Sequence, residues 1–244
     1  MSGTPAMMLT MPLLNDGNTK TKKGEAFGWI TYGMHLAPST LSGKNVCPSA
    51  SAGCAAACLN TAGRGVMRNV QEARINKTKR FFSDRNGFLS ELRKEISRAL
   101  KKAERKEMEA CFRLNLTSDL PWESLDIINA FPNYQFYDYT KIKSRMLRYL
   151  AGELPQNYHL TFSRSEDTPD WFVHEIIKMH RGNVAVVFNK DSTTSSGLPV
   201  KWQGLRVIDG DVSDLRFRDP RGVIVGLRSK GRGKKDNTGF VVTT

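Results

Sequence analysis

The sequence lacks the features of a membrane or secreted protein. Its longest apolar stretches are well short of the roughly 18 residues that a transmembrane helix needs. We identify no secretory signal, because Thr10 and Pro12 interrupt the apolar residues near the N-terminus. The 20 glycines and 10 prolines in 244 residues are ordinary globular values, which excludes collagen-like and low-complexity chains. We therefore expect a cytoplasmic protein without a membrane partner.

Acidic residues are scarce relative to basic ones. The chain has 24 Asp and Glu against 37 Lys and Arg, which gives a formal net charge of +13. Because such an excess attracts polyanions, we expect nucleic acid or a nucleotide as the partner. The alternative is a charge that only keeps the protein soluble. The densest basic run, at 228–235, lies in the C-terminal segment 228–244, where intervening glycines would let the chain follow a phosphate backbone.

Several common catalytic motifs are also missing. The sequence contains no phosphate-binding loop, dinucleotide-binding glycine motif, nucleophile elbow or His-Glu-x-x-His motif. These absences argue against the usual nucleotide hydrolases, serine hydrolases and zinc proteases.

The pattern of apolar residues predicts an α/β fold. Short apolar runs alternate with helical segments after residue 110, and a helical stretch at 67–108 is broken by turn residues at 83–87. Strand–helix–strand repetition predicts parallel strands with right-handed crossovers. We expect a partial or incomplete (βα) barrel of the TIM-barrel type, with a doubly wound open sheet as the alternative. The expected strands are 27–36, 111–116, 134–139, 158–162, 184–188, 205–208 and 223–227.

The domain organisation expected from these patterns is simple. Residues 1–24 are rich in Thr, Asn, Lys and Gly and predict a flexible N-terminal arm. Residues 25–244 predict a single barrel-like domain that contains a cysteine loop at 37–65.

Cysteine is rare, but three of the four cysteines are close together. Cys47, Cys54 and Cys58 have the spacing C-x6-C-x3-C among small residues. Three thiolates from one loop match a [4Fe-4S] cluster with one open iron, and we predict them as its ligands. The alternatives are a zinc site, for which Cys111 or His35 could supply a fourth ligand, and thiols that bind no metal.

Polar residues gather where the predicted strands end, which is the edge where parallel βα folds build their sites. Asp119, Lys141 and Glu166 are our candidates for catalysis. Ser163, Arg164 and Asp119 are our candidates for binding a cofactor.

The order of the elements and the three-cysteine loop resemble the radical S-adenosylmethionine (SAM) superfamily. There, a loop after the first barrel strand holds a [4Fe-4S] cluster, and SAM chelates the open iron. The resemblance implies that Asp119 would contact the ribose or amino group of SAM, and that Ser163 and Arg164 would hold its carboxylate. It also implies reduction of SAM to a 5′-deoxyadenosyl radical.

The sequence more closely resembles bacteriophage gene-product proteins related to radical SAM enzymes. The similarity rests on the cysteine loop and on three strand ends, at 115–122 (NLTSDLPW), 137–141 (YDYTK) and 160–166 (LTFSRSE). It implies a cluster-binding barrel encoded by a phage, expected in the host cytoplasm. Our functional hypothesis is an iron–sulfur protein that acts as a radical-SAM-like enzyme on nucleic acid or a nucleotide. One alternative is a non-enzymatic iron–sulfur protein that binds nucleic acid or a host partner. The other is a zinc-binding protein associated with nucleic acid.

Overall fold

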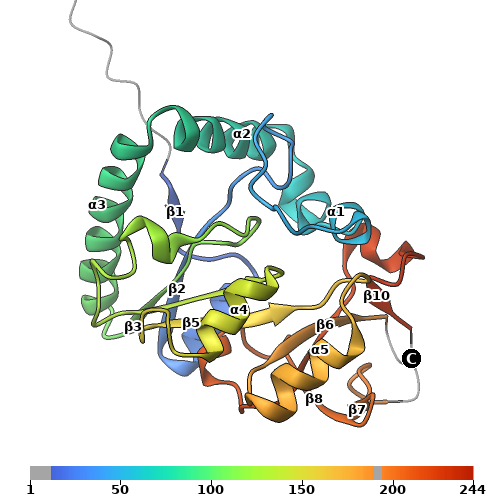
Figure 1. Cartoon of the computed structure of the whole chain (residues 1–244). Coiled ribbons are helices and arrows are strands. Elements are labelled where there is room, and N and C mark those ends of the chain that lie inside the picture. The colour runs from blue at the N-terminus through green and yellow to red at the C-terminus, as the bar shows by residue number, and fades with distance from the viewer. Residues whose placement is uncertain (1–11, 190–193, 244) are drawn as a thin grey trace, which may run out of the picture.

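The computed structural model describes residues 12–189 and 194–243. Its centre is a ten-stranded mixed sheet with the order β1-β2-β3-β4-β5-β6-β9-β8-β7, and β10 pairs with β6 (Figure 1). The strands are β1 (Leu14–Asn15), β2 (Trp29–Met34), β3 (Glu109–Arg113), β4 (Gln135–Thr140), β5 (Tyr158–Ser163), β6 (Val184–Phe188), β7 (Lys201–Trp202), β8 (Leu205–Asp209), β9 (Ile224–Arg228) and β10 (Val241–Val242).

Helices and single helical turns connect these strands. The α-helices are α1 (Ala52–Ala56), α2 (Arg68–Ser83), α3 (Arg85–Glu104), α4 (Lys143–Leu150) and α5 (Asp170–His174), and α5 continues into the π-helical turn η5 (Glu175–Met179). The 3-10 turns are η1 (Thr21–Phe27), η2 (Leu59–Thr61), η3 (Gly63–Val66), η4 (Trp122–Leu125), η6 (Arg216–Arg218) and η7 (Gly231–Lys235). Most expected strands and helices are therefore confirmed.

The predicted incomplete (βα) barrel is wrong, because the strands form a mixed sheet that does not close in the described residues. The strands β2 to β6 do run parallel in consecutive order. However, β1 pairs antiparallel with β2, and β7 pairs antiparallel with β8, so a short antiparallel strand ends the sheet on each side. Closure would require the two end strands to pair. After β6 the described chain also contains no α-helix that could connect further parallel strands around a barrel.

The two faces of the sheet have different cores. Phe112, Phe136 and Leu160 belong to the large apolar core. The alternating neighbours Cys111 and Tyr137 point to the opposite face, where they pack with residues from η6 and its vicinity. Consecutive parallel strands with right-handed crossovers place their helices on one face, which explains why that face is the apolar one.

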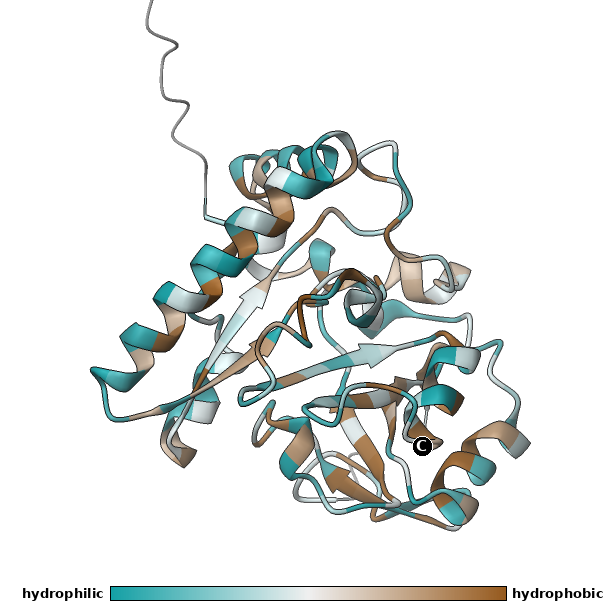
Figure 2. Ribbon diagram, turned by 60° about the vertical axis from the view of Figure 1, so that its left-hand side comes forward, coloured by the Kyte–Doolittle hydropathy of each residue, from teal (hydrophilic) through white to brown (hydrophobic). Residues whose placement is uncertain are grey.

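Helices α2 and α3 show how the sequence pattern becomes structure. The predicted break at 83–87 is confirmed, because Asp84 accepts a hydrogen bond from the Gly87 amide at 2.9 Å and caps α3. Apolar side chains at three- and four-residue steps along α3 are buried, and Figure 2 shows brown and teal residues alternating along this long helix at the left. None of the helices in the described residues combines the length and the apolar character that crossing a bilayer requires.

Part of the expected N-terminal arm is built into the fold. Leu13 and Leu14 are buried, and their amides donate hydrogen bonds to the Glu95 carboxylate of α3 at 2.9 and 2.8 Å. Thus residues 12–24 of the segment pack on the sheet and α3. Residues 1–11 lie outside the described residues.

Candidate functional site

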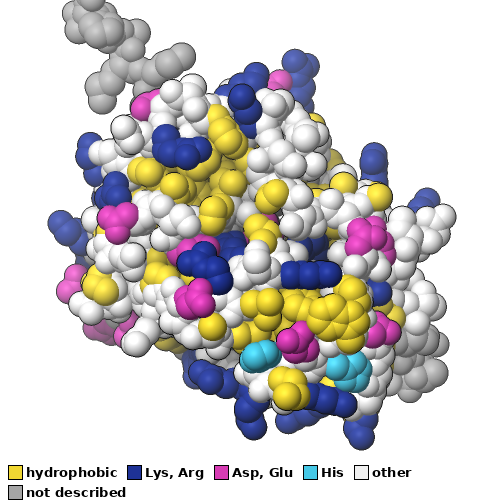
Figure 3. Space-filling model, viewed as in Figure 1, with side chains coloured by type: hydrophobic (Ala, Val, Ile, Leu, Met, Phe, Trp, Pro, Cys, Tyr) yellow, Lys and Arg dark blue, Asp and Glu magenta, His cyan; other side chains and the backbone are white. Residues whose placement is uncertain are grey.

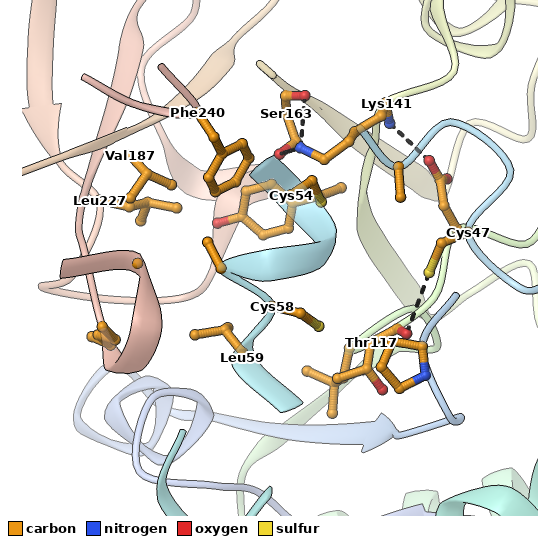
Figure 4. Close-up of a pocket in the computed structure, with 18 of the residues that line it drawn as sticks. Cys47, Cys54, Cys58, Leu59, Thr117, Lys141, Ser163, Val187, Leu227 and Phe240 are labelled. Atoms are coloured by element: carbon orange, nitrogen blue, oxygen red, sulfur yellow. Dashed lines mark hydrogen bonds between the residues drawn. The ribbon is translucent and has the colours of Figure 1, made fainter. Parts of the chain in front are cut away.

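A pocket of about 240 Å³ opens at the carboxyl ends of the parallel strands. Its walls come from the segments that follow β3, β4 and β5, from the cysteine loop, and from η7 and the residues around it. Among the predicted site residues, Asp119, Lys141 and Ser163 line this pocket together with the three neighbouring cysteines (Figure 4). Arg164 and Glu166 do not line it, although both lie in the segment after β5.

Lys141 projects into the pocket with a positive charge that has only neutral acceptors. Its Nζ donates to Ser163 Oγ at 2.8 Å and contacts the carbonyl oxygens of Ser163 at 3.2 Å and Arg164 at 3.3 Å (Figure 4). It also lies 5.0 Å from the centre of the Phe240 ring. In the described residues no carboxylate oxygen lies within 4.0 Å of this nitrogen. Desolvation lowers the pKa of Lys141, and the nearby Cys54, Asp119 and Glu166 oppose that shift.

Asp119 is held by partners on both carboxylate oxygens. Oδ1 accepts from Arg145 Nη1 at 2.8 Å, and Oδ2 accepts from the Lys141 amide at 2.7 Å and from Thr140 Oγ1 at 3.2 Å. Burial raises the pKa of Asp119, and Arg145 opposes that shift. Asp119 therefore joins the ends of β3 and β4 to helix α4.

Glu166 anchors the cysteine loop from outside the pocket. Its carboxylate accepts from Ser51 Oγ and from the Gly53 amide, each at 2.6 Å. Ser51 in turn accepts from the Cys54 amide and caps α1. A Cβ at Gly53 would lie 2.7 Å from Glu166 Oε1, so glycine is required for this close approach.

Arg164 is directed toward the C-terminal segment. Its Nη1 donates to the Gly239 carbonyl at 2.6 Å, and its guanidinium lies 5.7 Å from the Trp202 ring centre. These contacts hold the turn before β10 in place. Arg164 therefore supports a wall of the pocket without lining it.

The structure contradicts the predicted [4Fe-4S] cluster. Across residues 12–189 and 194–243, no group of three or more His, Cys, Asp and Glu side chains is placed so that it could hold a metal ion. Cys47, Cys54 and Cys58 all line the pocket, but they stand on separate parts of its wall (Figure 4). The predicted binding of SAM depended on an open iron of this cluster, so that prediction is contradicted as well.

The surroundings of the three thiols favour their protonated form when no metal is bound. The Cys47 thiol accepts from the Ser39 amide at 3.3 Å and lies 3.6 Å from the Thr117 carbonyl oxygen. Burial raises the pKa of Cys47 to about 11, and it also raises the pKa values of Cys54 and Cys58. Without a bound metal, these three cysteines are therefore protonated thiols at neutral pH.

The fourth cysteine lies away from the pocket. Cys111 is buried between β2 and β4, where Thr31 Oγ1 lies 3.3 Å from its sulfur. Burial raises its pKa to about 12.

Sequence reasoning missed two charged residues in the pocket wall, namely Lys20 and Arg113. Lys20 and Arg113 share the buried carboxylate of Asp214, at 3.1 and 2.7 Å. The Arg113 guanidinium also lies 4.5 Å from the Tyr139 ring centre. The Tyr139 hydroxyl is buried and has no hydrogen-bond partner in the described part of the chain. The arginine inside the apolar run 111–116 was a usable signal, whereas nothing in the sequence near Lys20 pointed to the site.

The pocket has an apolar side opposite these charges. The apolar side chains come from the segments after α1 and β3, from β6 and β9, and from β10 and the residue before it, namely Leu59, Leu116, Val187, Leu227, Phe240 and Val241. Figure 4 shows Leu59, Val187, Leu227 and Phe240 on the side of the cysteine loop that faces away from Cys47. The pocket thus combines an apolar wall with a few convergent polar groups, which is typical of small-molecule sites.

Comparison with known proteins places the chain in a family. Residues 12–244 match the family described as gene product 88. The chain belongs to the gene product 88 family. The expected bacteriophage gene-product family is thereby confirmed.

No curated protein and no solved structure is significantly similar to the chain. The expected resemblance to radical SAM enzymes therefore has no support from the comparisons.

Proposed function

We propose that this member of the gene product 88 family binds a nucleotide in the pocket at the carboxyl ends of β3, β4 and β5. The phosphate would contact Lys141, and the base would pack against the apolar wall. The observation that carries the proposal is the Lys141 ammonium, a half-buried charge whose hydrogen-bond partners are all neutral. A partly desolvated cation that contacts no carboxylate would be stabilised by direct contact with an anionic ligand.

The charge balance of the lining favours an anion over a cation. Five basic residues line the pocket, against two carboxylates: the basic residues are Lys20, Arg113, Lys141, Arg228 and Lys230. Both carboxylates are already paired, because Asp119 binds Arg145 and Asp211 binds Arg228 and Lys230. Lys20 and Arg113 pair with Asp214, so Lys141 is the basic residue of the lining that contacts no carboxylate in the described part of the chain. Phosphate suits such a site, since hydrogen bonds between a charged donor and a charged acceptor are stronger than neutral ones.

The shape and the apolar wall favour a ligand with a flat ring as well as a charge. The cavity volume of about 240 Å³ is close to the lower end, about 300 Å³, of typical ligand sites. Phe240 offers an aromatic side chain near Lys141, so one ligand could place a ring and a phosphate on neighbouring parts of the wall. The buried Tyr139 hydroxyl would gain a hydrogen-bond partner from the same ligand.

Calorimetric titration with the four ribonucleoside 5′-monophosphates, and with the four nucleosides that lack the phosphate, tests this proposal. We expect the wild type to bind at least one monophosphate more tightly than its nucleoside. Lys141→Met should weaken the monophosphate by about tenfold to a hundredfold, the loss of one charged hydrogen bond, and leave the nucleoside unchanged. Lys106→Met, which removes an exposed lysine beyond α3, is the matched control and should bind as the wild type does. Equal binding by Lys141→Met, or no binding of any monophosphate by the wild type, would refute the proposal.

A further inference from the structure

A strongly basic turn forms part of the pocket wall. Lys230 and Gly233, at and within η7, line the pocket, and η7 lies against η2 of the cysteine loop. The packing is close, because a Cβ at Gly231, where φ is +54°, would come 2.9 Å from Ala62 Cβ. The turn is therefore fixed beside the opening of the pocket.

The outward face of η7 carries three exposed cations, Arg232, Lys234 and Lys235, which we call the basic rim. In the described residues no carboxylate lies within 4.0 Å of any of them. Their neighbours Arg228 and Lys230 differ, because both pair with Asp211. Lys and Arg side chains stand out from the right-hand margin of the molecule, where α1 and the C-terminal segment lie (Figures 1 and 3).

We propose that the natural ligand is a single-stranded nucleic acid, with one nucleotide in the pocket and the adjoining phosphates on the basic rim. This inference rests on the proposed nucleotide pocket and extends it. A pocket of about 240 Å³ has no room for a duplex, so the strand must present an unpaired nucleotide. Unpaired cations beside the opening supply the sequence-independent attraction that a polynucleotide backbone requires.

The experiment compares mononucleotides with 12-residue single strands of DNA and RNA over a series of salt concentrations. We expect the strand to bind more tightly than its mononucleotide. In the triple variant Arg232→Gln/Lys234→Gln/Lys235→Gln, we expect the slope of log affinity against log salt to fall by about 0.7 per cation removed. Mononucleotide affinity should not change, because the rim lies outside the pocket.

A charge-matched control variant distinguishes binding at the basic rim from general attraction between the strand and a positively charged protein. Lys94, Lys101 and Lys106 are exposed lysines on and just after α3, which lies on the opposite side of the molecule from η7 (Figure 1). Their triple glutamine variant should keep the wild-type affinity and salt slope for the strand. An equal loss of strand affinity in this control variant would contradict a specific role of the basic rim. Binding of polyglutamate of the same charge as tightly as the strand would contradict it as well.

The design distinguishes failure of the rim from failure of the pocket. Mononucleotide binding that depends on Lys141, with no gain from the longer strand, would overturn the nucleic-acid inference alone. Absence of mononucleotide binding would overturn the proposed function and this inference with it. The DNA and RNA arms decide which strand is preferred.

Discussion

Lys141 directly follows β4, and Arg145 lies four residues later in α4, but the two cations have different surroundings. Arg145 binds the carboxylates of Asp119 and Glu123 and the hydroxyl of Tyr158, at 2.6 to 2.9 Å. Lys141 contacts one hydroxyl and two carbonyl oxygens. The protein itself supplies the carboxylates that neutralise Arg145. Lys141, by contrast, contacts no carboxylate within 4.0 Å in the described residues, which is the property of a site for an anionic ligand.

The largest expected difference between the two cations is in stability. Arg145→Met leaves two buried carboxylates without their partner and should lower the free energy of unfolding by about 3–5 kcal/mol. Lys141→Met removes an unpaired charge and should change it by less than about 1 kcal/mol. Urea denaturation of both variants measures this contrast. Similar losses in the two variants would show that Lys141 is as structural as Arg145.

The pH dependence of stability tests Asp138, a buried carboxyl that shares the Tyr158 hydroxyl with Arg145. Asp138 accepts from the Asn115 amide at 2.7 Å and from Tyr158 Oη at 2.8 Å, and burial raises its pKa to about 7. A carboxyl with a raised pKa binds its proton more tightly when folded, so stability should fall as pH rises from about 4 to 7 and level off above that. The expected size is on the order of a few kcal/mol.

Thermal unfolding of Asp138→Asn across this pH range tests the assignment. The variant should show a smaller fall in stability between pH 4 and 7 than the wild type. Asp167→Asn, an exposed aspartate, should follow the wild type. An unchanged pH profile in Asp138→Asn would assign the dependence to other groups.

Glu166 should give a moderate effect, because it positions the loop that walls the Lys141 pocket. Glu166→Gln cannot serve Ser51 and Gly53 as two charged acceptors, and should cost about 1–2 kcal/mol in thermal unfolding. Although burial opposes it, the hydrogen bond from Ser51 lowers the pKa of Glu166. This stabilisation should therefore be present above about pH 4.5 and be lost as pH falls below that value. A stable variant with wild-type nucleotide affinity would show that the anchor is unimportant.

The last expected effect concerns the reactivity of two cysteine thiols and not the stability of the fold. Because burial raises the pKa of Cys47 to about 11, its thiolate fraction at pH 8 is roughly a hundredth of that of an ordinary thiol, and its alkylation should slow accordingly. Cys111, with a pKa of about 12, should react more slowly still. Mass spectrometry after timed iodoacetamide treatment measures both rates. Rapid alkylation of Cys47 would contradict its placement against Ser39 and Thr117.

The elements of this fold follow from local patterns, but their closure does not. The capped start of α3 and the strand–helix rhythm from 110 to 188 are short-range signals, and both predicted real elements. The end of the sheet depends on two-residue strands such as β7, whose pairing is decided by tertiary contacts and leaves little trace in periodicity. For this reason the expected incomplete barrel gave way to a mixed sheet.

The candidate site was half predictable for a similar reason. Parallel strands bring their carboxyl ends together, so Asp119, Lys141 and Ser163 could be grouped from position alone. The direction of a side chain could not be predicted in this way. Arg164 points to the C-terminal segment, and Glu166 points to the cysteine loop. Cysteine spacing was misleading, because closeness in sequence does not make three sulfurs converge.

A crystal structure of the wild-type protein, soaked with a nucleoside monophosphate that binds in calorimetry, tests the central claim most directly. The account predicts density for a phosphate within about 3 Å of Lys141 Nζ, with the base against the apolar wall. Density for the nucleotide elsewhere on the surface, with Lys141 still held by Ser163, would contradict it.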